Sequence, residues 1–219
     1  MKQVASLSIV VFTMAFFNCS GKTSNESAII KPVSAEQAEK LDTAYFASGC
    51  FWCTEAVFER VKGVYDVVSG YSGGKEKNPT YRQVSAGATS HAEAVRVLYD
   101  SEEVSYNLLV EMFFGSHDPT TLNRQGPDVG PQYRSAIFYQ TDQEKRIASE
   151  VKDRLDQQGK FKDPIVTEIT KFKAFYIAED YHQNYYELHP NQPYIVSVSR
   201  PKVEKFMKSF KDRLKDQYK

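Results

Sequence analysis

The sequence predicts an α+β fold, a two-layer α/β sandwich in which helices pack against a mixed β-sheet. Residues 91–100 and 165–172 alternate with the period of two that is typical of strands. Helical patterns over residues 105–117 and 142–159 lie between predicted strands. Several connections between strands are too short to hold a crossover helix, so the sheet is expected to contain both parallel and antiparallel pairs.

The first elements surround a Cys-x-x-C motif. Residues 43–48 (TAYFAS) are predicted to form a short buried strand, and Gly49 supplies the turn into a helix over residues 51–61. A second strand, within residues 64–74, runs into a glycine turn. On the strand at 91–100, Glu93 shares one face with Val95 and Val97, and this face is expected to be buried.

The second half of the chain continues the alternation. An amphipathic helix at 105–117 leads into a loop over 118–134, and a loop of that length is uncommon unless it is functional. The strand SAIFYQ and a charged helix ending at Gly159 follow, and then the strand at 165–172. The last predicted element is a basic helix over 201–217 with Phe206 and Phe210 on one side.

Composition excludes one class of partner. The 219 residues include 28 basic and 28 acidic side chains, with no block of one sign. A nucleic-acid-binding surface usually needs a clear basic excess, so no nucleic-acid partner is expected.

The N-terminus has the pattern of an export signal. Lys2 precedes an apolar run at 4–17, which is shorter than the roughly 20 residues that span a bilayer. The run ends just before Cys19, where a bacterial lipoprotein signal has its lipidated cysteine, although Asn18 departs from the usual small residue. We therefore expect a lipoprotein-like signal peptide over 1–18, a polar tether over 19–41 and one domain over 42–219. The alternative is an ordinary cleaved signal with an incidental cysteine.

Cys50 and Cys53 are then the only cysteines of the exported domain. A disulfide across so short a loop constrains the unfolded chain little, which favours a chemical role. A helix N-terminus is expected to lower the pKa of Cys50 from ~8.5 to roughly 3.5–7.5, as suits a nucleophile, while Cys53 lies one turn further on. A structural zinc site needs four ligands, and the nearest downstream histidine is His91, so no metal is expected.

The segment GCFWCTEAVFERVKGVYDVVSGYSGG resembles the A-type peptide methionine sulfoxide reductases, whose signature is Gly-Cys-Phe-Trp followed soon by Glu. Four further segments resemble that family in the same order: NPTYRQVSAGATSHAEAVRVLYD, FFGSHDPTTLNRQGPDVGPQYRSAIFY, FKAFYIAEDYHQNYY and NQPYIVSVSRPKVEKF. The match covers roughly residues 43 to 210. It implies a ferredoxin-like core and a reaction that uses no metal or organic cofactor.

The resemblance also implies residue roles. Cys50 attacks the sulfur of methionine sulfoxide, and Glu93 protonates the departing oxygen; burial of Glu93 independently favours a raised pKa and a neutral acid. Phe51 and Trp52 line an apolar pocket for the methyl group of the substrate. Tyr81 and Tyr133 donate hydrogen bonds to the sulfoxide oxygen. Three further residues belong to the same pocket or lie near it: Asp128, His182 and Tyr185. Core packing is the alternative for the aromatic residues and for His182, and an exposed position is the alternative for Glu93.

Two positions depart from the family pattern. Ser90 stands where the family usually has glycine, which is expected to narrow the backbone freedom beside Glu93. Ile195 stands where many members have a recycling cysteine, and no cysteine follows Cys53. Cys53 is therefore expected to resolve the sulfenic acid on Cys50 in place of that cysteine.

The N-terminal pattern and the resemblance together predict an exported, lipid-anchored monomer. It is expected to reduce the S epimer of methionine sulfoxide, free or in proteins, and to repair oxidised exported proteins. A thioredoxin-like donor would reduce the disulfide between Cys50 and Cys53. Two alternatives remain at this point: a thioredoxin-like disulfide oxidoreductase, since a strand–Cys-x-x-Cys–helix pattern suits that fold too, and a non-catalytic lipoprotein that binds peptides through an aromatic groove.

Overall fold

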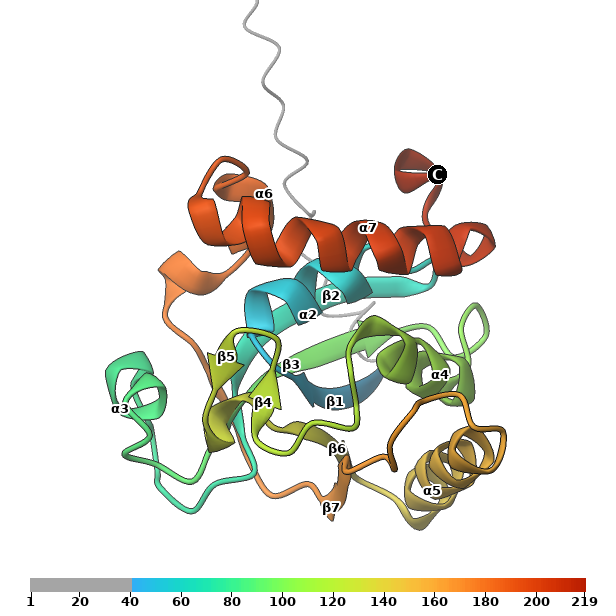
Figure 1. The fold of residues 1–219 in the computed structure, drawn as a ribbon, viewed down its shortest axis with the longest axis horizontal. Coiled ribbons are helices and arrows are strands. Elements are labelled where there is room, and N and C mark those ends of the chain that lie inside the picture. Colours follow the sequence, from blue (N-terminus) through green and yellow to red (C-terminus); the bar gives the residue numbers. More distant parts are fainter. Residues whose placement is uncertain (1–40) are drawn as a thin grey trace, which may run out of the picture. The chain divides into compact units, whose positions relative to one another are not determined.

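The computed structural model describes residues 41–219, so the predicted signal peptide and Cys19 lie outside the described residues. Within this range, no helix combines the length and the apolar character needed to cross a bilayer. Figure 1 shows a sheet with its helices gathered mainly on one side.

The main sheet has six strands in the order β7-β6-β1-β3-β2-β8. The pair β6–β7 is parallel and all other neighbouring pairs are antiparallel, which confirms the predicted mixed sheet. The strands are β1 (Asp42–Ser48), β2 (Val64–Ser72), β3 (Ala92–Tyr99), β6 (Ser135–Tyr139), β7 (Glu168–Lys171) and β8 (Phe175–Ile177).

The centre of the fold has the β-α-β-β-α-β order of a ferredoxin-like core. Helix α2 (Phe51–Glu59) connects β1 to β2, and helix α4 (Tyr106–Ser116) follows β3 and leads to β6. In the sheet these four strands stand in the order β6-β1-β3-β2, with every neighbour antiparallel. The predicted fold class is therefore confirmed.

The helices on the main face form a deep core. Helix α2 packs against β2 and β3, α5 (Asp142–Gln157) packs beside α4, and α7 (Arg200–Ser209) packs on both α2 and α4 (Figure 1). Because α2 lies between the sheet and α7, eight of its nine residues are buried. The opposite face of the sheet has a smaller core of alanines and Phe138, covered by Tyr45, Phe172 and Phe175.

The C-terminal helix is shorter than predicted. The sequence pattern predicts a helix over 201–217, but α7 ends at Ser209 and the chain turns at Phe210. Beyond this turn the backbone pairs with the end of α2: Lys62 N–H donates to Arg213 O at 2.8 Å, and Lys215 N–H donates to Arg60 O at 2.9 Å. These backbone hydrogen bonds replace the helical ones, which explains the early end.

The long loop at 118–134 contains structure that the sequence did not indicate. A two-stranded hairpin, β4 (Arg124–Gln125) and β5 (Asp128–Val129), is followed by a 3₁₀ turn at Pro131–Tyr133. Gly126 has a φ of 59° at the hairpin tip, a conformation that glycine adopts without strain. Other short elements were also not predicted: α3 (Tyr81–Ser85), α6 (Tyr185–Leu188) and a π-helix at Ile195–Ser199.

Candidate active site

Cys50 lies at the N-cap of α2, as the sequence predicted. Its carbonyl accepts hydrogen bonds from Cys53 N–H at 3.2 Å and from the Thr54 hydroxyl at 3.3 Å. The preceding Gly49 has a φ of 88°, and a Cβ there would lie 2.6 Å from Gln125 Cβ. Only glycine fits this turn, which delivers Cys50 to the helix end from the buried strand β1.

The two thiols differ in their environments. Cys50 is 6% exposed and Cys53 is fully buried, and both are free. Burial raises the pKa of Cys50, so the expected lowering by the helix N-terminus is wrong for the free protein. A hydrogen bond with Cys50 instead lowers the pKa of Cys53 to about 6 against the effect of burial, helped by the charge of Lys202. The pKa values of the two thiols are therefore shifted in opposite directions, upward for Cys50 and downward for Cys53.

Glu93 points from β3 to the start of α2. It is 3% exposed and shares the buried face with Val95 and Val97, as predicted. Its Oε2 accepts a hydrogen bond from Phe51 N–H at 3.0 Å, which satisfies one of the free donors at the helix end. Burial raises the pKa of Glu93 to about 8, against the lowering effect of that bond. Glu93 is therefore mainly a neutral acid at pH 7.

Tyr81 and Tyr133 both lie near Cys50 and Glu93, whose charges contribute to their pKa values. Burial and the charges of Glu93 and Cys50 raise the pKa of Tyr81 to about 12. Burial and the Glu93 and Asp128 charges also raise the pKa of Tyr133. Both hydroxyls therefore keep their protons at neutral pH and are available as hydrogen-bond donors.

Glu179, which the sequence did not indicate, positions Tyr81. One carboxylate oxygen accepts from Tyr81 N–H at 2.9 Å, and the other accepts from the Tyr71 hydroxyl at 2.9 Å. Tyr71 is fully buried on β2, so this bridge ties the short helix α3 to the sheet.

Aromatic side chains form a wall beside the cysteines. The Trp52 ring stacks on Tyr185 with centroids 3.9 Å apart, and Trp52 Nε1–H donates to His182 Nδ1 at 3.1 Å. Phe51 is 1% exposed, with its ring centroid 5.0 Å from that of His182 and 6.4 Å from that of Tyr81. Trp52 therefore has a fixed orientation, and Phe51 forms a deeper layer behind it.

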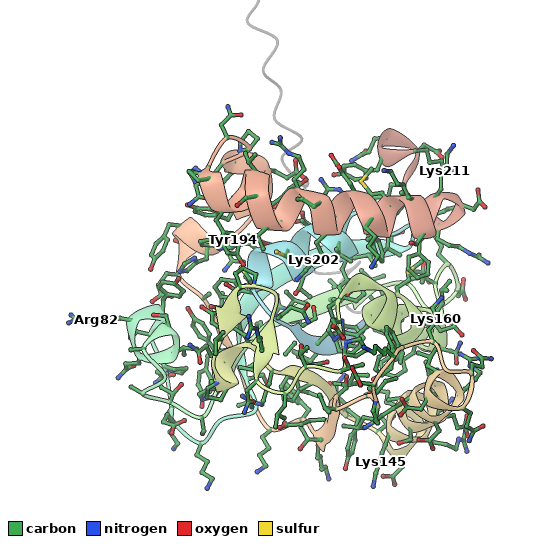
Figure 2. The ribbon with its side chains drawn as sticks, viewed as in Figure 1. Arg82, Lys145, Lys160, Tyr194, Lys202 and Lys211 are labelled. Atoms are coloured by element: carbon green, nitrogen blue, oxygen red, sulfur yellow. The ribbon has the colours of Figure 1, made fainter. Side chains whose placement is uncertain are left out.

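Tyr194 is a site residue that sequence reasoning missed. Its hydroxyl donates to Asp128 Oδ2 and lies close enough to the Cys50 thiol to lower the pKa of that thiol against the larger effect of burial. The ring of Tyr194, which is labelled in Figure 2, packs edge-on against the Trp52 ring with centroids 5.8 Å apart. Tyr194 thus connects the hairpin residue Asp128 to Cys50. Tyr194 directly precedes Ile195, the position at which many members of the family have a recycling cysteine.

Ser90 does not strain the backbone beside Glu93. It is not among the residues with a positive φ, so glycine is not required there. Its hydroxyl donates to Glu76 Oε2 at 2.9 Å and accepts from Lys75 N–H at 3.0 Å. Over residues 41–219, no three His, Cys, Asp or Glu side chains lie close enough together to hold a metal ion.

A buried cysteine pair, a neutral carboxyl at the same helix end and two protonated tyrosines define a cysteine-dependent oxidoreductase. The family model described as "Peptide methionine sulfoxide reductase" matches residues 42–214, and the chain belongs to this family. It is an enzyme that uses thiols to reduce methionine sulfoxide to methionine. Family membership decides against the disulfide-oxidoreductase and peptide-binding alternatives.

Relatives and solved structures agree with this assignment. The chain is 52% identical over 174 residues to peptide methionine sulfoxide reductase MsrA 1 of Rhodopirellula baltica, covering 80% of this chain and 90% of that protein. It is 50% identical to MsrA of Trichodesmium erythraeum, covering 80% and 98%. The reduced form of Mxr1 from Saccharomyces cerevisiae superposes with a TM-score of 0.65 at 35% identity, covering 70% of this chain and 88% of that one. Methionine sulfoxide reductase A of Corynebacterium diphtheriae has a TM-score of 0.61 at 37% identity, covering 69% and 76%.

Proposed function

We propose that Cys50 and Glu93 carry out the oxygen transfer on the S epimer of methionine sulfoxide, free or in proteins. The Cys50 sulfur bonds to the sulfoxide sulfur while Glu93 protonates the sulfoxide oxygen, and the proton of the Cys50 thiol passes to Glu93. The protonated oxygen then moves to the Cys50 sulfur as the original sulfur–oxygen bond and the new sulfur–sulfur bond break, which leaves methionine and a sulfenic acid on Cys50. The observation that carries this proposal is the buried Glu93 carboxyl, which accepts the hydrogen bond of Phe51 N–H beside Cys50 and whose pKa is raised by burial to about 8.

The surrounding residues bind the substrate. The hydroxyls of Tyr81 and Tyr133 donate hydrogen bonds to the sulfoxide oxygen, whose negative charge grows during the step. Trp52, with Phe51 packed behind it, forms the apolar surface for the methyl group. The other site residues support this surface or border it: Asp128 and Tyr194 through their mutual hydrogen bond, and His182 and Tyr185 through their contacts with Trp52.

An assay with the two separate epimers tests the proposed substrate and its stereochemistry. With dithiothreitol as reductant, the purified protein is expected to convert the S epimer of methionine sulfoxide to methionine and to leave the R epimer unchanged. Each epimer is supplied separately and methionine is quantified by chromatography. Equal rates on both epimers would contradict the proposed stereochemistry.

We further propose that Cys53 resolves the sulfenic acid and that a thioredoxin-like dithiol reduces the resulting disulfide. The fully buried Cys53 lies in the first turn of α2, where its N–H donates to the Cys50 carbonyl at 3.2 Å. A lowered pKa makes it a thiolate near neutral pH, which is the form that attacks sulfur.

Replacing Cys53 with serine is expected to separate the two half-reactions. The variant retains Cys50 and Glu93 and should still form one equivalent of methionine per enzyme. Turnover with thioredoxin should collapse, because that donor needs a disulfide to attack. Mass spectrometry of the substrate-oxidised wild type should show a peptide pair linked through Cys50 and Cys53, and the variant should hold a sulfenic acid that dimedone traps. Full thioredoxin-driven turnover by the variant would eliminate the resolving role.

The protein is also proposed to be exported, anchored by lipid on Cys19 and active as a monomer in the repair of oxidised exported proteins. The support is the apolar run at 4–17 that ends at this cysteine. Wild type should incorporate a labelled fatty acid during growth, and Cys19→Ala should take up none and remain unprocessed by the lipoprotein signal peptidase. Absence of label in the wild type would make Cys19 incidental.

A further inference from the structure

The Cys53 sulfur faces α7, away from solvent. Its Sγ lies 3.1 Å from the Oγ of Ser199, the last residue of the π-helix, and both residues are fully buried. Over residues 41–219 this is the only hydrogen bond of the Ser199 side chain. A hydroxyl can accept from a thiol and, after rotation, donate to a thiolate, so Ser199 suits both states of Cys53.

Lys202 brings a positive charge to the same sulfur. It follows Ser199 by three residues and therefore lies on the same side of the helix. Its Nζ is 3.8 Å from the position a Cβ would take at Gly49, directly before Cys50. In Figure 2, Lys202 lies beneath α7, on the side of α2. Lys202 forms no ion pair with any residue of the described range, so its charge is not neutralised by a carboxylate partner.

Other titratable groups around Cys53 also affect its charge. Cys50 on the same helix shares a hydrogen bond with it, Asp128 from β5 opposes its ionisation, and Lys202 from α7 favours it. Glu93 from β3 is mainly neutral at pH 7, and Tyr194 keeps its proton because burial and the cysteines raise its pKa. Lys202 is therefore the one full positive charge among these groups.

We propose, on the basis of the function proposed above, that Ser199 and Lys202 are positioning residues that hold the Cys53 sulfur as the thiolate which resolves the sulfenic acid. The Cys53 thiolate attacks the Cys50 sulfur, the sulfur–oxygen bond of the sulfenic acid breaks, and the sulfur–sulfur bond forms. The leaving oxygen takes up one proton and departs as water, so Cys50 is reduced and Cys53 is oxidised.

The same contacts determine which sulfur of the disulfide an external dithiol attacks and which one it releases. An external dithiol reaches the slightly exposed Cys50 in preference to the fully buried Cys53. The better-stabilised thiolate is the better leaving group, and Ser199 and Lys202 stabilise that of Cys53. The mixed disulfide with the donor therefore forms on Cys50 and releases Cys53.

The test measures the two half-reactions separately in Ser199→Ala, Lys202→Gln and Lys202→Arg, with Lys205→Gln as the matched control on the same helix. Rapid quenching gives the methionine formed in the first turnover, and loss of dimedone-reactive sulfenic acid gives the resolution rate from pH 5 to 9. Each unit rise in the Cys53 pKa lowers the thiolate fraction about tenfold at pH values below it.

We expect one equivalent of methionine from every variant. Ser199→Ala and Lys202→Gln should resolve the sulfenic acid at least several-fold more slowly at pH 5 to 6, with the midpoint of the pH profile moved upward. Lys202→Arg and Lys205→Gln should resemble the wild type. An unchanged resolution rate, or uniform slowing with an unchanged midpoint, would overturn the proposal. Failure to form the first equivalent in the wild type would instead overturn the proposed roles of Cys50 and Glu93.

Discussion

Cys50→Ser is expected to abolish the reduction of methionine sulfoxide. A serine hydroxyl is not ionised near neutral pH and attacks sulfur poorly, so no sulfenic acid forms and the half-reaction stops before any methionine is released. Methionine should be undetectable in both multiple-turnover and single-turnover assays with dithiothreitol. Because every later step needs the oxidised Cys50 sulfur, no change of donor should rescue the variant.

The fold should tolerate this change. Cys50 is the N-cap of α2 and makes no side-chain capping hydrogen bond, whereas serine is among the preferred residues at an N-cap. The variant should therefore unfold at or above the wild-type temperature by circular dichroism. Cys53→Ser, which retains the nucleophile, is the matched control and should still release its single equivalent. Sustained turnover by Cys50→Ser would remove Cys50 from its assigned role.

The sequence allowed the centre of the fold and the neighbourhood of Cys50 to be predicted because both depend on local pattern. Strict alternation on β3 placed Glu93 on the same face as Val95, and that face is buried. The strand–glycine–helix pattern placed Cys50 at the N-cap of α2. Both inferences concern residues only a few positions apart, and over such a distance the geometry of a strand or helix fixes the direction in which each side chain points.

What could not be predicted depends on long-range contacts. Tyr194 reaches Cys50 and Asp128 only because the chain returns over α2 after α6, and one tyrosine among 14 has no local mark of such a position. The pattern of the last helix continues past Ser209, but the backbone after Phe210 pairs with Lys62 instead. Tertiary pairing overrode helix propensity there.

The ionisation of Cys50 was mispredicted for a related reason. A helix N-terminus is visible in the sequence, and it favours a thiolate. The burial of Cys50, which raises its pKa, and the contacts of Cys53 with Cys50 and Lys202, which lower the pKa of Cys53, are not visible in the sequence. In the proposed oxygen-transfer step, the raised pKa of Cys50 makes Glu93 the group that exchanges its proton.

Glu93→Gln is expected to slow the oxygen-transfer step by about 10²–10⁴-fold, the range that general acid catalysis typically contributes. Glutamine keeps the size of the side chain, and its carbonyl oxygen still accepts the Phe51 N–H hydrogen bond, but it has no proton to transfer. Single-turnover formation of methionine measures this step without interference from disulfide reduction. A loss under about threefold would remove Glu93 from the role of proton donor.

The pH dependence separates the loss of a proton from a loss of shape. In wild type the acid form of Glu93 predominates below a pKa of about 8, so the oxygen-transfer rate should fall as pH rises through that value. The rate of Glu93→Gln should lack this decline. The raised pKa also means that the native protein binds more protons than the unfolded chain between about pH 4 and the folded pKa, so the free energy of unfolding of the wild type should fall across that window as pH rises. Glu93→Gln removes this contribution and should lose less stability between pH 5 and 8 in urea titrations. A variant that is slow and also unstable at every pH would show that the substitution damaged the packing at the start of α2, and the proton-donor role would then rest on the wild-type pH profile alone.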